Sequence, residues 1–580
     1  MINLKINGVD VSAPEGSTIL EAARLAHIDI PTLCFLKEIN EIGACRICVV
    51  EIKGARSLAA SCVYPVNEGM EVWTNTPKVL DSRKKTLQLI LSNHDRKCLS
   101  CVRSGNCELQ KLAKDLKVED EAKFDGEINK YELDFSAAHM VRDNNKCILC
   151  RRCSAVCEKV QAVGVIGAND RGFKTHISSA FNMGLGETSC VSCGQCIAVC
   201  PVGAIYEKDY TEEVFAAIAN PEKHVVVQVA PAVRAAIGES FGLPIGTNAE
   251  GQMIAALQRL GFDKVFDTDF SADLTIMEEA TEFLDRVQNG GKLPIITSCS
   301  PGWIKYCEHY FPDMTENLSS CKSPQQMFGA VLKTYYAEKM GWDPKDIVSV
   351  SIMPCTAKKF EIGRDDEAAA GVPDVDIALT TRELARMIER AGLNFLELPV
   401  DEKFDAPLGE STGAGVIFGA TGGVMEAALR TAVWKLTGEP VDSPLEFKEV
   451  RGVEGIKEAT YHVGDMDVKL AVASGLGNAK TLLEKVNAGE ADYHFIEIMG
   501  CPGGCVNGGG QPQVPARIRN FTDIRALRAK VLYDLDESRE LRKSHDNPAI
   551  KELYDNYLGE PGSHKAHELL HTSFVKRSIN

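Results

Sequence analysis

The sequence predicts a multidomain chain in which small α+β domains precede one large α/β domain. The first observation is the distribution of 21 cysteines, of which fifteen lie in closely spaced sets up to Cys200 and six lie beyond Pro294. The second is the part beyond about residue 220, where β-rich runs alternate with helical stretches as in α/β layers. A length of 580 residues, 44% of them hydrophobic, allows about four domains with cores of their own.

Composition and charge exclude several classes of function. A net charge of -17 argues against nucleic acid as a partner, because phosphates repel an acidic surface. The acidic residues fit either an ordinary solvated surface or a face that docks on a basic partner. The chain starts without a signal-peptide pattern, and no apolar run reaches the roughly 18 residues of a membrane span. We therefore expect a cytoplasmic protein, with no membrane partner, whose reduced cysteines bind metal.

The first cysteine set follows a predicted hairpin and helix. Residues 2–6 and 9–11 alternate in polarity around an Asn7-Gly8 turn, and Thr18 caps a helical run over residues 19–26. The set has the spacing C-x10-C-x2-C-x13-C and consists of Cys34, Cys45, Cys48 and Cys62. It resembles plant-type 2Fe-2S ferredoxins, with a longer first gap, and this implies a β-grasp domain over residues 1–78 with one 2Fe-2S cluster. A zinc ribbon is the alternative, although zinc sites usually pair two short C-x2-C knuckles.

The second set includes a histidine. It follows the apolar helical run 87–91 with the spacing H-x3-C-x2-C-x5-C and consists of His94, Cys98, Cys101 and Cys107. A histidine at the end of a helix is often only structural. Beside three cysteines without a fourth partner, His94 is predicted to complete a 4Fe-4S site with one histidine and three cysteine ligands, in a domain over residues 79–118. An imidazole ligand makes the cluster less negative, and the comparable exchange in Rieske centres raises the potential.

A polar linker, residues 119–137, separates these sets from two C-x2-C-x2-C-x3-C repeats within a domain over residues 138–210. This is the bacterial two-cluster ferredoxin pattern, in which the fourth cysteine of each repeat binds the other cluster. One 4Fe-4S cluster is therefore assigned to Cys147, Cys150, Cys153 and Cys200. The other is assigned to Cys190, Cys193, Cys196 and Cys157.

Three cysteine-bearing loops follow β-rich runs in the large domain, predicted over residues 220–515. They are residues 297–303, 353–359 and 497–505. Sites in α/β folds lie at the carboxyl ends of strands, so we expect these loops to converge on one buried centre. Gly503, Gly504 and the run Gly508–Gly510 remove side chains where backbone approaches something bulky, and ordinary turn glycines are the alternative.

These loops and the preceding cysteine sets resemble the iron-only (FeFe) hydrogenases along nearly the whole chain. The resemblance implies an H-cluster, a 4Fe-4S cubane joined to a two-iron unit with CO, cyanide and aza-dithiolate ligands. It implies that Cys355 and Cys501 ligate the cubane, that Cys505 supplies the bridging thiolate and that Lys358 bonds a cyanide. The pocket residues that it implies are Ala230, Pro231, Gln325, Met353 and Met499, although methionine is more often plain core.

The first loop departs from the family pattern. The commonest form has two adjacent cysteines, the first relaying protons and the second ligating the cubane, whereas this chain has Cys299 followed by Ser300. Serine oxygen is a poorer ligand for iron-sulfur than thiolate, and Ser300 before Pro301 is also typical of a helix N-cap. Three alternatives remain open for the fourth ligand of the cubane. In the first, Ser300 is the ligand and Cys299 donates protons. In the second the ligand is Cys299, and in the third it is Cys307 or Cys321.

A helical segment supplies acids for proton transfer. Glu279, Glu282 and Arg286 lie on one helix face, which by itself is typical of a salt-bridged surface. The resemblance implies a proton path through Cys299, Glu279, Ser319 and Glu282 that ends near Arg286.

Two further segments are not assigned to catalysis. The glycine-rich residues 412–423 lack a G-x-G-x-x-G motif between strand and helix, so we expect no flavin or nicotinamide site there. Residues 516–580 resemble the carboxy-terminal helical wrap of the family, and the histidines of this tail are predicted to be structural.

The predicted function is reversible hydrogen oxidation and proton reduction, with electrons relayed through one 2Fe-2S and three 4Fe-4S accessory clusters. The variant first loop favours the catalytic subunit of a hetero-oligomeric, electron-bifurcating hydrogenase, with flavin-containing NADH dehydrogenase-like subunits as partners. A monomeric enzyme that uses ferredoxin is the alternative. A hydrogen sensor is disfavoured because Cys299 is present, and an electron-transfer subunit of NADH dehydrogenase type leaves Cys355, Cys501 and Cys505 unexplained.

Overall fold

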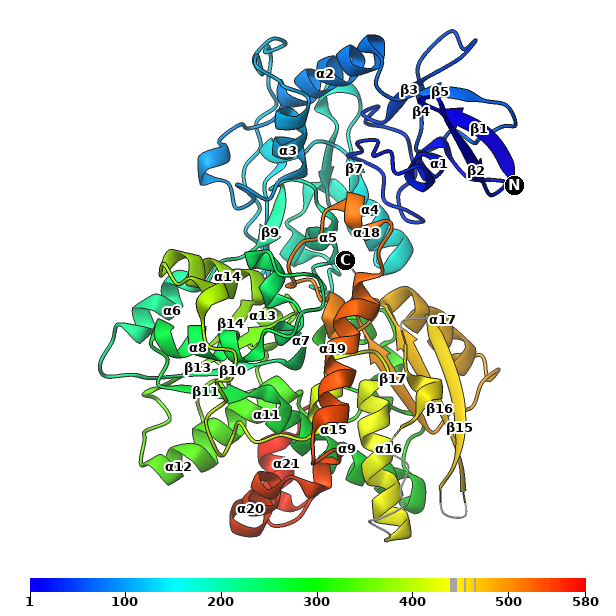
Figure 1. Cartoon of the computed structure of the whole chain (residues 1–580). Coiled ribbons are helices and arrows are strands. Elements are labelled where there is room, and N and C mark those ends of the chain that lie inside the picture. Colours follow the sequence, from blue (N-terminus) through cyan, green and yellow to red (C-terminus); the bar gives the residue numbers. More distant parts are fainter. Residues whose placement is uncertain (439–445, 453–454, 464–465, 580) are drawn as a thin grey trace.

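The predicted order of small α+β domains and one large α/β domain is confirmed. The computed structural model describes residues 1–438, 446–452, 455–463 and 466–579. Figure 1 shows the amino-terminal residues, blue to cyan, stacked on the catalytic part, and the orange segment near residue 516 reaches up between them. Within the described residues, no helix combines the length and the apolar character needed to cross a membrane.

The amino-terminal sheet forms as the alternating pattern predicts. Strands β1 (Ile2–Ile6) and β2 (Val9–Ala13) pair antiparallel across a turn in which Asn7 and Gly8 both have positive φ, 52° and 84°. The sheet order is β2-β1-β5-β3-β4, with β3 (Val49–Ile52), β4 (Ala59–Ala60) and β5 (Glu71–Trp73). Helix α1 (Ile19–Leu25) begins at Thr18, which forms the expected cap as part of a capping box with Glu21.

The next two cysteine sets lie on short elements. Helices α2 (Pro77–Leu91) and α3 (Glu108–Asp115) flank the second set, and residues 116–139 form no helix or extended strand. Each of the two repeats contains one short helix, α4 (Arg152–Ala155) in the first and α5 (Gln195–Val199) in the second. Two small antiparallel pairs close this region: β6 (Met140–Arg142) with β9 (Ile205–Glu207), and β7 (Gly167–Asn169) with β8 (His176–Ser178).

Two four-stranded sheets form the frame of the catalytic part. The first is parallel, in the order β11 (Lys264–Asp267), β10 (His224–Val229), β13 (Ile347–Met353) and β14 (Ile377–Thr380). The second has the order β12 (Ile295–Ile296), β17 (Phe495–Met499), β16 (Met466–Ser474) and β15 (Ile456–Val463), with only β15 antiparallel. Strand β12 is shorter than the β-rich run 293–297, because Pro294 has no N–H to donate to a ladder.

Helix α9 (Thr268–Asn289) joins the cores of the two sheets. Its Phe270 and Leu274 pack in the core beside β10, whereas Ala272 and Ile276 pack in the core of β16 and β17. The remaining helices cover the sheets and form the carboxy-terminal tail. They are α6 (Thr211–Ile218), α7 (Pro231–Arg234), α8 (Glu250–Leu260), α10 (Pro301–Tyr310), α11 (Pro324–Val331), α12 (Ala337–Met340), α13 (Lys358–Glu361), α14 (Thr381–Arg390), α15 (Gly413–Val416), α16 (Gly423–Thr437), α17 (Leu476–Asn487), α18 (Ala516–Arg519), α19 (Ile524–Ser538), α20 (Pro548–Leu553) and α21 (His564–Leu570).

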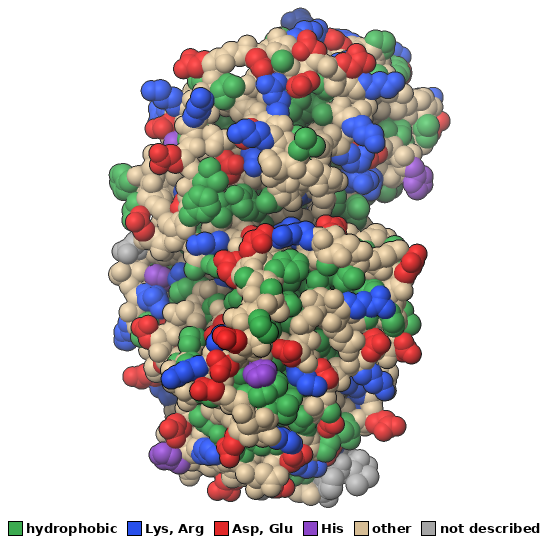
Figure 2. Space-filling view, turned by 90° about the vertical axis from the view of Figure 1, so that its left-hand side faces the viewer, with side chains coloured by type: hydrophobic (Ala, Val, Ile, Leu, Met, Phe, Trp, Pro, Cys, Tyr) green, Lys and Arg blue, Asp and Glu red, His purple; other side chains and the backbone are tan. Residues whose placement is uncertain are grey.

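The surface carries both signs of charge. Figure 2 shows acidic and basic side chains interspersed over the face drawn there, and the structure narrows between its upper and lower parts. The net charge of -17 is thus not gathered into one acidic patch on that face. This pattern fits the ordinary solvated surface better than a single-signed docking face.

A buried carboxylate of α9, that of Asp273, helps to fix the carboxy-terminal tail. Asp273 is fully buried and accepts hydrogen bonds from the Thr412 N–H (2.9 Å), the Thr412 hydroxyl (2.7 Å), the Ser544 hydroxyl (2.8 Å) and the Asn547 side-chain amide (3.0 Å). This carboxylate therefore links three segments that are distant in the sequence. Its loss would be costly, because the buried donors would keep their desolvation penalty without an acceptor.

We predict that Asp273→Ala lowers the free energy of unfolding by about 3 kcal/mol, because it leaves buried donors without an acceptor. Thermal unfolding of the cluster-loaded protein measures this. The control is Asp285→Ala on the same helix, whose exposed carboxylate contacts the Asn289 amide, with an expected change within about 0.5 kcal/mol. Equal midpoints for the two variants would contradict the role of Asp273.

Candidate functional site

A buried pocket lies where the carboxyl ends of the two catalytic sheets meet. The segments after β10, β12, β13 and β17 all reach it, as predicted for loops at the carboxyl ends of strands. Its cavity volume is about 80 Å³. Eleven of the predicted site residues line it: Ala230, Pro231, Cys299, Ser300, Gln325, Met353, Cys355, Lys358, Met499, Cys501 and Cys505.

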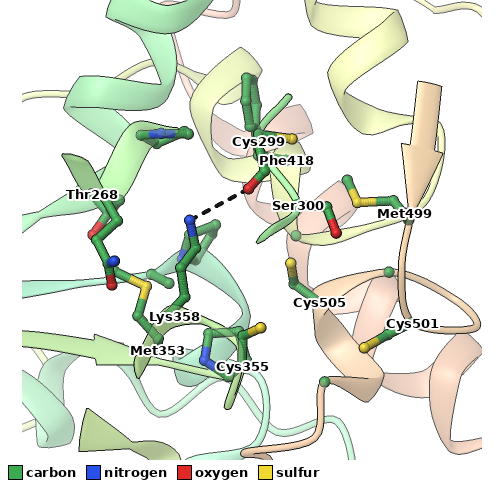
Figure 3. A pocket seen from close by; sticks show the side chains of 18 of the residues that line it. Thr268, Cys299, Ser300, Met353, Cys355, Lys358, Phe418, Met499, Cys501 and Cys505 are labelled. Atoms are coloured by element: carbon green, nitrogen blue, oxygen red, sulfur yellow. Dashed lines mark hydrogen bonds between the residues drawn. The ribbon is translucent and has the colours of Figure 1, made fainter. Parts of the chain in front are cut away.

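Three half-buried cysteines line one part of the pocket. Figure 3 shows the sulfur atoms of Cys355, Cys501 and Cys505 and the hydroxyl of Ser300 around a common space. Burial raises the pKa of all three thiols, that of Cys505 to about 12. Without a cation they stay protonated, and a metal cluster supplies the charge that thiolates need at this depth. The donor set therefore fits an iron-sulfur cluster.

Glycines keep the space between the loops open. Gly504 has φ +89°, and a Cβ there would meet the Thr421 nitrogen at 2.7 Å. A Cβ on Gly508 would meet the Pro354 carbonyl oxygen at 2.1 Å. Both positions exclude other residues, because side chains would push the cysteine loops apart. The glycines are packing elements of the pocket rather than ordinary turn residues.

Cys299 and Ser300 face different surroundings. Ser300 is the N-cap residue of α10, yet its hydroxyl caps nothing and instead accepts a hydrogen bond from the Gly500 N–H at 3.2 Å. The Cys299 thiol lies apart, beside Phe418 (Figure 3), and its pKa is raised well above the usual value by burial and by the neighbouring Glu279. Cys307 and Cys321 do not line the pocket.

Lys358 is held by a buried polar group that the sequence reasoning missed. Its ammonium lies 2.7 Å from the Ser323 hydroxyl and 2.9 Å from a Glu361 oxygen. It also lies 3.4 Å from the Cys299 carbonyl oxygen, a contact that Figure 3 draws. The same Glu361 oxygen accepts from the Gln325 amide at 2.9 Å. Spacing of i to i+3 from Lys358 was the only signal for Glu361. Thr268 and Phe418 also line the pocket and had no signal in the sequence.

The predicted proton-path residues form a chain behind Cys299. The Ser319 hydroxyl donates to Glu282 at 2.9 Å, and the Glu282 carboxylate pairs with Arg286 at 2.6 Å. Glu279 is 1% exposed, and burial, reinforced by the nearby Glu282, raises its pKa to about 8. One Glu279 oxygen has no hydrogen-bond partner within the described part of the chain. A carboxyl group that is neutral at pH 7 and not fully bonded is suited to passing protons.

The repeats bring their cysteines together in the crossed arrangement. One cavity is lined by Cys147, Cys150, Cys153 and Cys200, and a second by Cys157, Cys190, Cys193 and Cys196. Burial raises the pKa of every thiol in the second set and, in the first, that of Cys147, Cys150 and Cys153, so both cavities also need cations to hold thiolates.

Cysteines of the first set also lie close to one another. The sulfur atoms of Cys48 and Cys62 lie 3.3 Å apart, and the Cys45 N–H donates to the Cys34 sulfur at 3.5 Å. In the second set, the buried Nδ1 atom of His94 has no hydrogen-bond partner among the described residues. Burial lowers the pKa of His94, which favours the neutral imidazole that metals bind.

Direct contacts connect the cluster sites. The Thr356 hydroxyl, beside Cys355, donates to the Ser192 carbonyl at 2.8 Å, which joins the second cavity to the pocket. The Asn40 amide donates to the carbonyl oxygens of Cys34 (2.7 Å) and Cys150 (2.9 Å), which joins the first set to the first cavity. Arg103, between Cys101 and Cys107, donates to the Cys200 carbonyl at 2.9 Å. The contacts therefore branch, with two outer sites that both adjoin the first cavity.

Family comparisons cover most of the chain. The matched families are described as "Iron only hydrogenase large subunit, C-terminal domain" (residues 223–509), "Iron hydrogenase small subunit" (522–577), "2Fe-2S iron-sulfur cluster binding domain" (1–77), "NADH-ubiquinone oxidoreductase-G iron-sulfur binding region" (83–122) and "4Fe-4S dicluster domain" (146–204).

Two similar hydrogenases match this chain over nearly the full length of both proteins. The chain is 52% identical to the NADP-reducing hydrogenase subunit HndD of Solidesulfovibrio fructosivorans, covering 100% of this chain and 99% of HndD. It is 43% identical to iron hydrogenase 1 of Clostridium pasteurianum, covering 99% and 100%. The solved structure of apo FeFe hydrogenase HydA1 from Chlamydomonas reinhardtii is 46% identical, with a TM-score of 0.57 over 64% of this chain and 100% of that one. Together with the pocket and its cysteine loops, these matches establish that the chain belongs to the iron-only (FeFe) hydrogenase family and is a hydrogenase with an iron-sulfur electron relay.

Proposed function

We propose that the chain is the catalytic subunit of a multimeric, NAD(P)-linked hydrogenase that oxidises hydrogen reversibly and bifurcates electrons. The observation that carries this is its 52% identity, over the whole length of both chains, to a protein named as a subunit of an NADP-reducing hydrogenase. Flavin-containing, NADH dehydrogenase-like subunits are the proposed partners, with ferredoxin as a second electron carrier.

The accessory clusters are assigned from the four cysteine sets. The set of Cys34 binds the 2Fe-2S cluster, the set of His94 one 4Fe-4S cluster, and the two crossed sets of the repeats one 4Fe-4S cluster each. The proposed domains are residues 1–78, 79–118, 138–210, 220–515 and 516–580, with 119–137 as the linker. Support comes from the two cavities lined by the crossed sets and from the separate family matches along the chain.

The H-cluster is assigned to the pocket at the sheet ends. Cys355, Cys501 and Cys505 would hold it through sulfur, and Ser300 would occupy the fourth position. Support for Ser300 comes from its hydroxyl, which faces the same space as the three sulfur atoms, whereas Cys299 lies toward Glu279. When bound, this cluster supplies the redox chemistry that splits and forms hydrogen.

The side chains of the pocket would hold the cluster in position and deliver protons to it. Lys358 offers a buried cation, fixed by Ser323 and Glu361, to an anionic ligand such as cyanide. Gln325 lines the pocket with its polar side chain, whereas Ala230, Pro231, Met353 and Met499 keep it largely apolar. Protons move between Cys299 and the surface through Glu279, Ser319 and Glu282, and Arg286 holds Glu282 in place.

We predict that Ser300→Ala alters the EPR signal of the cubane, because it removes one of the four side chains proposed to hold the H-cluster. Cys299→Ala is expected to keep the signal and the iron content but to slow turnover. Ser300→Cys is the matched control, since it restores a thiolate at the same position. An unchanged spectrum in Ser300→Ala would remove Ser300 from the ligand set.

We predict that Glu279→Gln slows hydrogen evolution at least about 100-fold, because the amide cannot pass a proton. With a pKa of about 8, Glu279 is protonated and able to donate below pH 8 and is a carboxylate above it. The wild-type rate should therefore fall as pH rises through 8, and Glu279→Gln should lack this step. Cluster spectra should not change, and Asp285→Asn on the same helix should behave as wild type. Full activity in Glu279→Gln would exclude it from the route.

The multimeric assignment is tested by purifying the chain from its native source under anaerobic, low-salt conditions. The expected result is a complex that contains FMN and couples hydrogen oxidation to reduction of NAD(P)+ together with ferredoxin. Flavin content, subunit composition and the ratio of the two reduced products are measured. A flavin-free monomer that is fully active with ferredoxin alone would favour the monomeric alternative instead.

A further inference from the structure

A second group of metal-binding side chains lies outside the pocket, where the carboxy-terminal tail meets α9. Glu282, Cys321 and His571 each offer one ligand atom, and these atoms all lie within 4.8 Å of one another. The three residues come from α9, from the segment before α11 and from the end of α21. No role in the pocket or in the cysteine sets accounts for Cys321 or His571.

Contacts with neighbouring groups hold the three side chains close to one another. The Cys321 sulfur lies 3.9 Å from Glu282 Oε2, while Glu282 Oε1 is the oxygen that pairs with Arg286. His571 is fixed on both sides, with Nδ1 2.8 Å from the Ser320 hydroxyl and Nε2 3.2 Å from Glu278 Oε2. Carboxylates orient metal-binding histidines in the same way in zinc proteins.

The donor set favours zinc among the divalent cations. One thiolate, one imidazole and one carboxylate, with water in the fourth position, match a three-ligand zinc site. A tetrahedral site places sulfur and oxygen ligands about 3.5 Å apart, so the 3.9 Å between Cys321 and Glu282 needs little adjustment. Mg²⁺ and Ca²⁺ prefer oxygen ligands and fit this set poorly.

Access and charge also suit a cation. Cys321 is fully buried, but the side chains of Glu282 and His571 are 14% and 7% exposed, so a metal can reach the group from their side. The fully buried carboxylate of Glu278 adds negative charge beside His571. Arg286 opposes the cation, but it lies against the other oxygen of Glu282 and against the carbonyl of Leu318 at 2.8 Å.

We propose that Glu282, Cys321 and His571 form an inhibitory zinc site that closes the outer end of the proton route. Binding replaces the thiol proton of Cys321, which leaves to solvent, by Zn²⁺. It also engages the Glu282 oxygen that accepts the Ser319 hydrogen bond. Glu282 then cannot exchange protons with Ser319. The blocking effect rests on the proton route proposed above, whereas the metal site itself rests only on the three side chains.

The test uses the cluster-loaded full chain with Zn²⁺ as the only added metal. Zinc content after gel filtration and the zinc K-edge X-ray absorption spectrum report binding, and methyl viologen-driven hydrogen evolution reports inhibition. We expect one zinc with a sulfur ligand, and a falling rate with increasing zinc while the iron-sulfur spectra stay unchanged. In Cys321→Ala and His571→Gln, each scaled to its own rate without zinc, half-inhibition should need at least about tenfold more zinc.

Matched controls separate this site from other thiols and histidines. Cys307→Ala removes another buried thiol that lies outside every cysteine set, and His564→Gln changes the exposed first residue of α21. Both should bind zinc and be inhibited as wild type. Zinc without a sulfur ligand, or equal zinc binding in Cys321→Ala and His571→Gln, would overturn the site. Bound zinc without inhibition would overturn the blocking role.

The two proposals fail in different ways. Full activity in Glu279→Gln would remove the proton route but leave zinc content and the absorption spectrum as predicted. Loss of the zinc site would leave the pH step and the slow turnover of the Glu279 variant untouched.

Discussion

The close backbone contact between the second repeat and the third cysteine loop is the constraint on which the electron relay depends. A Cβ on Gly509 would meet the Cys193 carbonyl oxygen at 2.3 Å, and one on Gly194 would meet the Thr356 hydroxyl at 2.3 Å. Only glycines allow two cluster-binding loops to touch in this way. Hydrogen bonds from Gln195 to the Asn507 carbonyl and from Gln161 to the Gly500 carbonyl, both 2.9 Å, fix the same interface. The accessory domains are therefore locked onto the catalytic part rather than tethered to it.

Helix α9 meets a second constraint, since it serves both structure and chemistry. Its apolar residues join two cores, and its buried acids, from Asp269 to Glu279, lie in the interior instead of on the surface. Asp273 is satisfied by four hydrogen bonds and is structural. One oxygen of Glu279 has no hydrogen-bond partner among the described residues, and an unbonded buried oxygen lowers the stability of the fold. A residue with a purely structural role has no reason to carry this cost. The contrast on one helix separates the acid that holds the fold from the acid proposed to move protons.

The sequence predicted those parts of the site whose geometry is local. Cysteine spacing predicted which residues line each of the two cavities of the repeats, because a short loop around a cluster leaves few alternatives. The three catalytic loops were found because each follows a strand. Glu361 was missed, since an acid three residues after a lysine is common on helix surfaces and only the fold buries it. The closeness of His571 to Glu282 was equally invisible, because it arises from packing of the tail against α9.

In the proposed arrangement, protons and electrons reach the pocket from different sides, which accounts for the departure of the first loop from the family pattern. Cys299 lies toward Glu279, whereas Ser300 lies beside Gly500, whose carbonyl oxygen accepts the bond from Gln161 on the electron side. Serine in place of cysteine at position 300 thus changes the part of the pocket next to Gly500 and Gln161. It leaves Cys299 and Glu279, on the proposed proton route, unchanged. Because oxygen is a harder ligand than sulfur, the proposed exchange alters the cubane rather than the proton route. Under this proposal the variant loop is compatible with turnover and changes the electronic properties of the cluster.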